Sequence, residues 1–306
     1  MEKMIKKKKL LLTGASGFLG WNICCRAAAE WAIYGLYFSH PINPPGINRI
    51  RADLRSFKEQ KKLFETLRPE AVIHTAAIAD PNFCQLNKEE SRAVNVGASL
   101  NLAGLCADYK IPLVFTSTDL VFDGSHPPYA EDDPPCPINV YGEQKALAEE
   151  GMRKRYPETI ICRLPLMFGD PGPAAQSFIQ PMLKALKENR DLRFFLDEFR
   201  TPVSGKTAAQ GLFLAMDEAE GIIHLGGRER ISRYDFGLLL QKVLGAHDAK
   251  LIPCCQKDIV LPAPRSADVS LDSSKAFALG FDPPALIEDL KDCLIKSSCP
   301  LGQHKS

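Results

Sequence analysis

KLLLTGASGFLG, residues 9–20, sets the expected architecture of this chain of 306 residues. Residues 9–13 are mostly apolar and predict a short buried strand, and residues 21–32 predict a helix. Between the two, Gly14, Gly17 and Gly20 recur at three-residue spacing. A strand, a glycine-rich turn and a helix in this order favour a loop that cradles phosphate, because the N-terminus of a helix attracts anions. The alternative is a tight turn with incidental glycines.

Each glycine has its own use in a turn that binds a dinucleotide. Gly14 permits the tight turn, Gly17 lets the backbone approach a pyrophosphate, and Gly20 allows the helix to pack closely on the strand. The loop residues expected to contact such a cofactor are Gly14, Ser16, Gly17, Phe18, Leu19 and Gly20.

The end of the second expected strand, residues 34–38, bears on the choice of cofactor. Sites that prefer NAD often carry an Asp or Glu here, which binds the ribose 2′-hydroxyl. This chain has Ser39 and His40 instead. Since no carboxylate stands there to repel a 2′-phosphate, we expect NADP(H) to be favoured over NAD(H), with Ser39 and His40 as contacts.

Strands and helical patterns alternate as far as residue 165, which predicts a doubly wound parallel sheet of the α/β class, a Rossmann-type fold. The further strands are expected at residues 71–77, 111–116 and 159–164, and the helices at residues 56–67 and 91–109. Beyond Pro165 the chain becomes rich in Gly and Pro. We therefore expect an NAD(P)-binding domain over residues 1–165 and a smaller substrate-binding region over residues 166–306, some segments of which return to the sheet.

Composition excludes several other classes of function. Lys and Arg number 38 and Asp and Glu 37, so the net charge of +1 gives no field that would attract nucleic acid or a membrane surface. No apolar stretch reaches the ~18 residues of a membrane span. The ten cysteines contain no C-x-x-C pair. We therefore expect no metal site and no disulfide framework, and a reducing, cytoplasmic location.

Tyr141 and Lys145 are the candidate reactive pair. Residues four apart share one face of a helix, and the sequence after Lys145 favours a helix. A neighbouring ammonium favours the ionised form of a phenol, so Lys145 is expected to lower the pKa of Tyr141. Upstream, Ser117 and Thr118 are delivered to the carboxyl end of a strand, where open parallel sheets bind ligands. The alternative is a surface Tyr and Lys on an amphipathic helix.

The same motifs, in this order, resemble the extended short-chain dehydrogenase/reductase family. Further segments resemble its branch of sugar-nucleotide reductases, typified by dTDP-4-dehydrorhamnose reductase; these are residues 117–124, 137–142, 200–202, 221–227 and 270–275. The resemblance runs from the first strand nearly to the C-terminus. Residues 78–84 depart from the polar, acidic run usual in the branch, which leaves the identity of the sugar open.

The resemblance implies catalytic roles for three residues. Tyr141 would donate a proton to a carbonyl as hydride arrives, Lys145 would bind the nicotinamide ribose and lower the pKa of Tyr141, and Thr118 would hold the carbonyl, with Ser117 as its possible substitute. It also implies cofactor contacts at Asp53, Leu54, Ala76, Ala77 and Pro165, and substrate pyrophosphate contacts at Arg200 and Arg265. From its spacing alone, Asp53 either touches the adenine or caps the helix that follows.

The expected activity is the NAD(P)H-dependent reduction of a 4-keto nucleotide sugar. Two alternatives stay open: an epimerase or dehydratase that retains NAD, and a regulatory dinucleotide-binding subunit like that of methionine adenosyltransferase. The expected partner is a small nucleotide-sugar substrate rather than nucleic acid or a membrane, and the chain is a possible homodimer.

Overall fold

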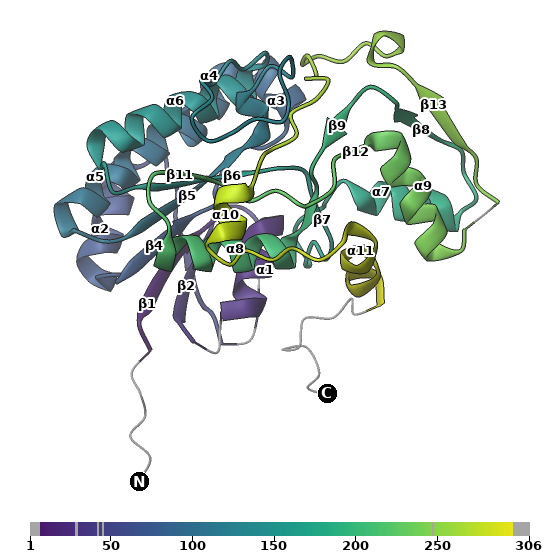
Figure 1. Cartoon of the computed structure of the whole chain (residues 1–306). Helices are drawn as coiled ribbons and strands as arrows, with labels where there is room; N and C mark the ends of the chain where they lie inside the picture. Colours follow the sequence, from purple (N-terminus) through teal and green to yellow (C-terminus); the bar gives the residue numbers. More distant parts are fainter. Residues whose placement is uncertain (1–6, 28–29, 42, 45, 247, 296–306) are drawn as a thin grey trace, which may run out of the picture.

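The computed structural model describes residues 7–27, 30–41, 43–44, 46–246 and 248–295. Its centre is one seven-stranded sheet in the order β11-β6-β5-β4-β1-β2-β3, in which every neighbouring pair is parallel (Figure 1). The strands are β1 (Lys9–Thr13), β2 (Ala32–Tyr37), β3 (Asn48–Arg51), β4 (Ala71–His74), β5 (Leu113–Thr118), β6 (Ile160–Leu164) and β11 (Ile222–His224). The predicted doubly wound α/β fold is confirmed.

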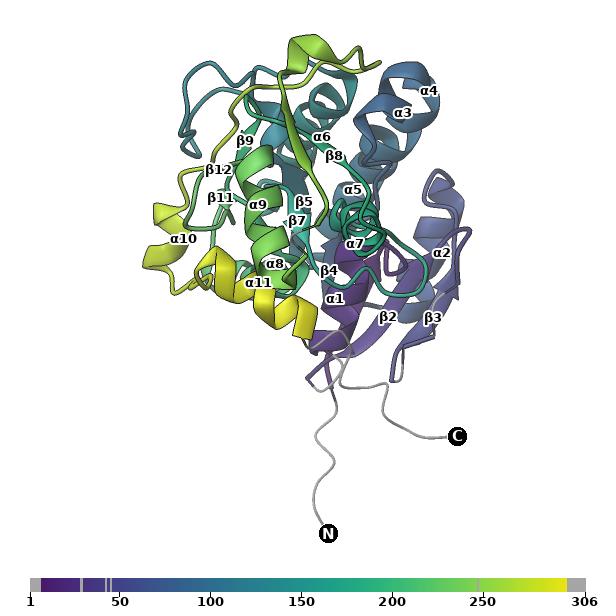
Figure 2. The ribbon, with the colours of Figure 1, turned by 90° about the vertical axis from the view of Figure 1, so that its right-hand side faces the viewer.

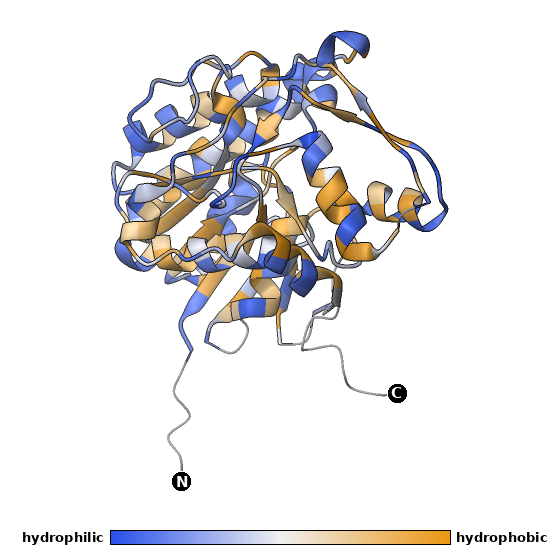
Figure 3. Ribbon diagram, turned by 45° about the vertical axis from the view of Figure 1, so that its right-hand side comes forward, coloured by the Kyte–Doolittle hydropathy of each residue, from blue (hydrophilic) through white to orange (hydrophobic). Residues whose placement is uncertain are grey.

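Helices cover both faces of the sheet, because its strands are apolar on both sides. One face packs on α1 (Phe18–Ala27) and α8 (Gly205–Glu218), and the other on α2 (Phe57–Leu67), α5 (Ser99–Tyr109) and α6 (Val140–Arg155). Leu10 and Leu12 join the first core while Leu11 joins the second, as the alternation of a strand requires. In Figure 3 the strands at the centre are mostly hydrophobic.

Four short helical segments lie between the longer helices and the strands. They are α3 (Pro81–Leu86), α4 (Lys88–Arg92), the π-helix η1 (Ala93–Ala98) and the 3-10 turn η2 (Asp119–Val121). The helix expected over residues 91–109 is therefore interrupted by a π-helical segment, in which the Asn95 side chain bonds Ile78 and Gln144.

A smaller region lies beside the carboxyl ends of β5 and β6 and has its own apolar core (Figures 1 and 2). Its strands pair two by two, β10 with β7, β12 with β9, and β13 with β8. It contains β7 (Met167–Phe168), α7 (Ile179–Lys187), β8 (Leu192–Phe195), β9 (Phe199–Arg200), β10 (Val203–Ser204), β12 (Ile231–Ser232), α9 (Arg233–Leu244), β13 (Leu251–Cys254), η3 (Gln256–Asp258) and α11 (Leu286–Ile295). The chain also returns from this region to the sheet through α8, β11 and the short helix α10 (Ser274–Ala278).

Two sequence expectations need correction. The helix expected over residues 21–32 begins earlier and ends at Ala27, since Ala32 already belongs to β2 and pairs with Lys9. The expectation that the cysteines form no disulfide is wrong at Cys25, which is disulfide-bonded. Cys24, Cys106 and Cys162 are free and buried, and burial raises the pKa of each thiol. Among the described residues, no helix has the length and apolarity needed to cross a membrane.

Candidate active site

The glycine loop between β1 and α1 packs directly against the end of β4. Gly14 has a positive φ of 70°, and a Cβ built there would lie 2.7 Å from the backbone N of Ala76. A side chain at Gly14 would therefore be strained and would clash. At Gly17 a built Cβ would meet only the Gly14 carbonyl, at 3.2 Å, so the loop is open on its other side. At Gly20 it would lie 2.1 Å from the same carbonyl, which explains the close packing of α1 on β1.

A cavity of about 320 Å³ lies along this loop and the ends of β2, β3 and β4. It is lined by most of the predicted cofactor-binding residues: Gly14, Ser16, Gly17, Ser39, Asp53, Leu54, Ala76 and Ala77. Phe18, Leu19 and Gly20 lie in the first turn of α1 and are not among the lining residues. His40 is exposed and bonds Ser39 at 2.9 Å, outside the cavity lining.

Asp53 is held by Arg55 and does not cap α2. The Arg55 Nη2–Asp53 Oδ2 distance is 2.7 Å, and this hydrogen bond, above all, lowers the pKa of the Asp53 carboxyl. The N-cap of α2 is Ser56, whose hydroxyl accepts from Glu59 N. Of the two roles open to Asp53, capping is excluded. Sequence reasoning missed Arg55, which lines the cavity with its guanidinium 5.1 Å from the ring centre of Phe38.

A second cavity, of about 540 Å³, opens between the sheet and the smaller region. It brings together the other predicted residues, Thr118, Tyr141, Pro165, Arg200 and Arg265. Lys145 lines neither cavity and lies one helical turn behind Tyr141.

Thr118 ends β5 and also begins η2. Its hydroxyl accepts from Leu120 N at 3.2 Å and donates to Asp119 Oδ1 at 3.1 Å. A hydroxyl has one proton, and in this structure Asp119 is an acceptor for it, while the same hydroxyl is also a hydrogen-bond partner of the Tyr141 phenol. The hydroxyl of neighbouring Ser117 is buried and has no hydrogen-bond partner among the described residues.

Tyr141 lies in the first turn of α6, where Asn139 caps the helix by accepting from Gly142 N at 2.9 Å. Burial, and secondarily the Asp119 carboxylate, raises the pKa of the Tyr141 phenol above its ordinary value. Lys145 is not among the causes of this shift. The lowering of the Tyr141 pKa expected from the sequence is therefore absent from this structure, because desolvation is the larger effect.

Lys145 is 2% exposed, and its ammonium donates to Thr116 O at 2.6 Å. It lies 3.9 Å from the ring centre of Phe115. Burial lowers the pKa of Lys145 to about 7, against an opposing contribution from Glu149. Burial therefore makes the Lys145 ammonium easier to deprotonate than that of a solvated lysine.

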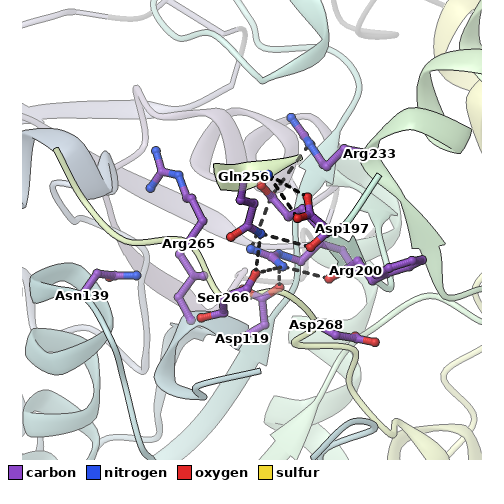
Figure 4. A network of polar contacts seen from close by, with 12 residues as sticks. Asp119, Asn139, Asp197, Arg200, Arg233, Gln256, Arg265, Ser266 and Asp268 are labelled. Atoms are coloured by element: carbon purple, nitrogen blue, oxygen red, sulfur yellow. Dashed lines mark hydrogen bonds and ion pairs between the residues drawn. The ribbon is translucent and has the colours of Figure 1, made fainter. Parts of the chain in front are cut away.

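Sequence reasoning missed three further charged residues that line the second cavity: Glu198, Arg193 and Arg233. It also gave no distinct role to Asp119, whose Oδ2 lies 3.3 Å from Arg200 Nε. Figure 4 shows the resulting network, in which Arg200 lies between Asp119 and Ser266. The signal for Asp119 was its place directly after Thr118 at a strand end. No local pattern marked Glu198 or Arg233.

The doubly wound sheet, the glycine loop at its first strand–helix junction and the Tyr-x-x-x-Lys helix beside a strand-end Thr define an extended short-chain dehydrogenase/reductase. The model of one family, the RmlD substrate binding domain, matches residues 8–299. The chain belongs to this family.

Individual relatives agree with this assignment. The chain is 31% identical to the probable low-salt glycan biosynthesis reductase Agl14 of Haloferax volcanii, over 91% of this chain and 95% of the relative. It is 26% identical to methionine adenosyltransferase 2 subunit beta of Xenopus laevis, over 90% of this chain and 84% of that one. Among solved structures, a hypothetical dTDP-4-dehydrorhamnose reductase from Sulfolobus tokodaii superposes with a TM-score of 0.80, at 29% identity, over 88% of this chain and 94% of the other.

Proposed function

We propose that this protein is an NAD(P)H-dependent reductase of a 4-keto nucleotide sugar, similar to dTDP-4-dehydrorhamnose reductase. The observation that carries the proposal is that Thr118 and Tyr141 line one cavity together with Arg233 and Arg265. A proton donor, a hydroxyl and cations for phosphate thus face the same space. The likeness to Agl14 and to the Sulfolobus tokodaii structure supports this activity.

The residues around the first cavity fit a dinucleotide. The first N–H groups of a helix have no partner within the helix, and here they open onto a loop without side chains at Gly14 and Gly17. We assign the pyrophosphate to this loop, the adenine side to Asp53 and Leu54, and the nicotinamide side to Ala76, Ala77 and Pro165. Bound there, a reduced nicotinamide would supply hydride. NADP(H) remains our favoured cofactor, because Ser39 stands where a repelling carboxylate would otherwise be found.

In the proposed mechanism Tyr141 is the general acid. Since its raised pKa keeps the phenol protonated at neutral pH, it can donate a proton to the carbonyl oxygen of the substrate while the carbonyl carbon accepts hydride. The product is the alcohol, and the Tyr141 phenolate recovers its proton from solvent. Lys145 binds the nicotinamide ribose and, when protonated, stabilises that phenolate.

The hydroxyl that holds the substrate carbonyl is Thr118 or Ser117. Thr118 must turn its proton from Asp119 towards the substrate, whereas the proton of Ser117 has no partner among the described residues. Thr118→Val and Ser117→Ala separate the two. The variant that loses the holding hydroxyl should lower kcat by about 10²-fold or more, the usual cost of one oxyanion donor, with NADPH binding unchanged.

The proposal is tested by supplying purified protein with NADPH or NADH and a panel of 4-keto nucleotide sugars. We expect oxidation of NADPH with a dTDP-linked 4-keto-6-deoxysugar, and loss of turnover in Tyr141→Phe. Failure of the wild-type protein to oxidise either cofactor with any member of the panel would refute the proposal.

The second candidate is a regulatory dinucleotide-binding subunit, and the 26% identity to methionine adenosyltransferase 2 subunit beta favours it. It predicts that the chain binds NADPH without turnover and changes the activity of another enzyme. The third candidate function, an epimerase or dehydratase, predicts that NAD stays bound to the protein through purification. Protein that emerges free of nucleotide and consumes NADPH stoichiometrically excludes both alternatives.

A further inference from the structure

Asp119 is a buried carboxyl group that the proposed mechanism does not use. It follows Thr118 directly, lines the second cavity and is 3% exposed. Its Oδ2 has no hydrogen-bond partner among the described residues. Buried polar atoms nearly always have such a partner, and the exceptions include groups that take part in chemistry. The position of Asp119 beside the proposed reacting residues therefore suggests a role in proton transfer.

The hydroxyl of Thr118 lies between two acids. It is the hydrogen-bond partner of Asp119 Oδ1, at 3.1 Å, and of the Tyr141 phenol. It also accepts from Leu120 N at 3.2 Å. A hydroxyl has one proton and two acceptor positions. It can therefore accept from Leu120 N and from a protonated Asp119 while it donates to Tyr141, so that hydrogen bonds join the three side chains without a gap.

The charges around Asp119 let its carboxyl change protonation near neutral pH. Burial raises its pKa to about 6, against Arg200 and Thr118, which favour the ionised form, and the Glu198 carboxylate adds to the rise. Burial also raises the pKa of the Tyr141 phenol, so Asp119 is much the stronger acid of the two. A protonated Asp119 can consequently reprotonate a Tyr141 phenolate. Arg200, whose Nε lies 3.3 Å from Oδ2, then stabilises the carboxylate that remains (Figure 4).

Lys145 is the other nearby source of a proton. Its ammonium donates to Thr116 O at 2.6 Å and lies over the ring of Phe115. No hydrogen bond joins it to Tyr141 among the described residues. The direct route to the phenol in this structure therefore runs through Thr118.

We propose that Asp119 restores the proton of Tyr141 through the hydroxyl of Thr118. The inference rests on the proposed function and deepens its account of the proton. After Tyr141 has protonated the carbonyl oxygen, the Thr118 proton moves to the phenolate and the Asp119 proton moves to Thr118. Two O–H bonds break and two form, nothing is oxidised or reduced, and the carboxyl becomes a carboxylate. Asp119 then takes a proton from water that enters the cavity when the product leaves.

The test compares kcat of the wild type and of Asp119→Asn from pH 5 to 8, with saturating NADPH and keto sugar. Asparagine keeps the acceptor for Thr118 but has no acidic proton. The ratio of kcat, wild type to variant, should be about 10² at pH 5, on the scale of general acid catalysis. It should fall about tenfold by pH 7, because the acid form of Asp119 is lost as the pH rises through about 6. Any titration of Lys145 is common to both proteins and cancels from the ratio.

The matched control is Asp289→Asn. Asp289 is also a buried carboxyl whose pKa is raised by burial, and its Oδ2 lies 3.2 Å from a threonine hydroxyl, that of Thr207. It lies at the N-terminus of α8 and does not line the second cavity. Its kcat should follow the pH profile of the wild type, and both variants should bind NADPH with unchanged affinity in a fluorescence titration.

Two results would overturn the inference: a kcat ratio within twofold of 1 at every pH, or a larger ratio that does not change with pH, as a purely structural role of Asp119 would give. If Asp119→Asn unfolds, Thr118→Ser and Thr118→Val give the same discrimination. Serine keeps the hydroxyl and should keep the loss of kcat above pH 6, whereas valine should abolish that loss; a valine variant that retains it would contradict the relay. Wild-type protein that oxidises no NADPH at any pH marks failure of the proposed function, and the inference falls with it.

Discussion

At the scale of single residues, Asp119 is a carboxylate whose charge is opposed by its burial. It is 3% exposed, and burial raises its pKa to about 6, although Arg200 and Thr118 both favour the ionised form. Its Oδ2 has the Arg200 ion pair but no hydrogen bond among the described residues. An asparagine at this position has nearly the same shape and no charge to desolvate, and Arg200 keeps Glu198 as a carboxylate partner.

We therefore predict that Asp119→Asn stabilises the protein above pH 6, by roughly 1–3 kcal/mol. Below about pH 4 the carboxyl is protonated in the folded and the unfolded states, so its contribution to stability is complete there. That contribution is lost as the pH rises through 6, because the folded state must then bury a charge. Urea unfolding of both proteins between pH 4.5 and 8 measures the difference, and a variant that is less stable at pH 8 would contradict this account.

Candidate site residues that belong to a short sequence motif could be predicted from the sequence. Tyr141 and Lys145 lie on one helix, and Thr118 ends a strand, so short motifs were enough to find them. Glu198 directly precedes β9 and Arg233 begins α9, so both are far along the chain from Thr118. Their partners are fixed only by how the smaller region docks on the sheet. The pKa of Tyr141 also depends on burial, which spacing does not reveal.

At the scale of elements, helix α6 is held against η2 by a close approach at Gly142. A Cβ built at Gly142 would lie 2.0 Å from Leu120 O, which is backbone and cannot turn aside. This contact sets the distance between Tyr141 on α6 and Thr118 at the start of η2. The proposed proton donor and the proposed carbonyl-holding hydroxyl therefore depend on a glycine that carries no chemistry of its own.

Gly142→Ala is expected to push α6 away from η2 and to lower kcat by about 10²-fold, the scale of loss from ångström misplacement of a catalytic group. Binding of NADPH should be little changed. Gly104→Ala is the matched control: it lies within α5, and a Cβ there meets nothing within 4 Å. It should be neutral or stabilise the chain by about 0.5–1 kcal/mol. Equal kcat in both variants would show that the Gly142 contact does not position Tyr141.

The sequence predicted whether a segment is a helix or a strand better than it predicted the residues at which the segment ends. Strand and helix order through residue 165 followed from apolar runs and glycines, except that strand β3 was missed because its residues are mostly polar and exposed. The end of α1 was misplaced because alanine-rich sequence continues after Ala27, while pairing with β1 already draws Ala32 into β2. The π-helix η1 was also missed, because the side-chain bonds of Asn95 to Ile78 and Gln144 are tertiary contacts.

At the scale of the whole molecule, the C-terminal half completes the sheet as well as the site. Strand β11 pairs with β6, and the apolar face of α8 shares one core with α1 and β1. Ala208, Leu212, Ile223 and Leu225 are fully buried in that core. Residues 166–306 therefore cannot be removed without uncovering the sheet.

A chain cut after Pro165 is expected not to fold. It would expose β6 as an edge strand, together with the apolar residues that α8 covers, a combination that favours aggregation. Size-exclusion chromatography and circular dichroism of residues 1–165, beside the full chain, give the measurement. A monomeric fragment with a cooperative melt would show that the dinucleotide-binding domain is independent, as the simple boundary at residue 165 implies.

The most direct test of the central claim follows hydride from cofactor to sugar. The protein is incubated with NADPH deuterated at the transferring position and a dTDP-linked 4-keto-6-deoxysugar, and the product is analysed by mass spectrometry. The account predicts that one deuterium is gained at C4 for each NADPH consumed, and that Tyr141→Phe, which still binds NADPH, yields no labelled product. Unlabelled sugar from the wild-type protein, with NADPH bound but not oxidised, would contradict the reductase assignment.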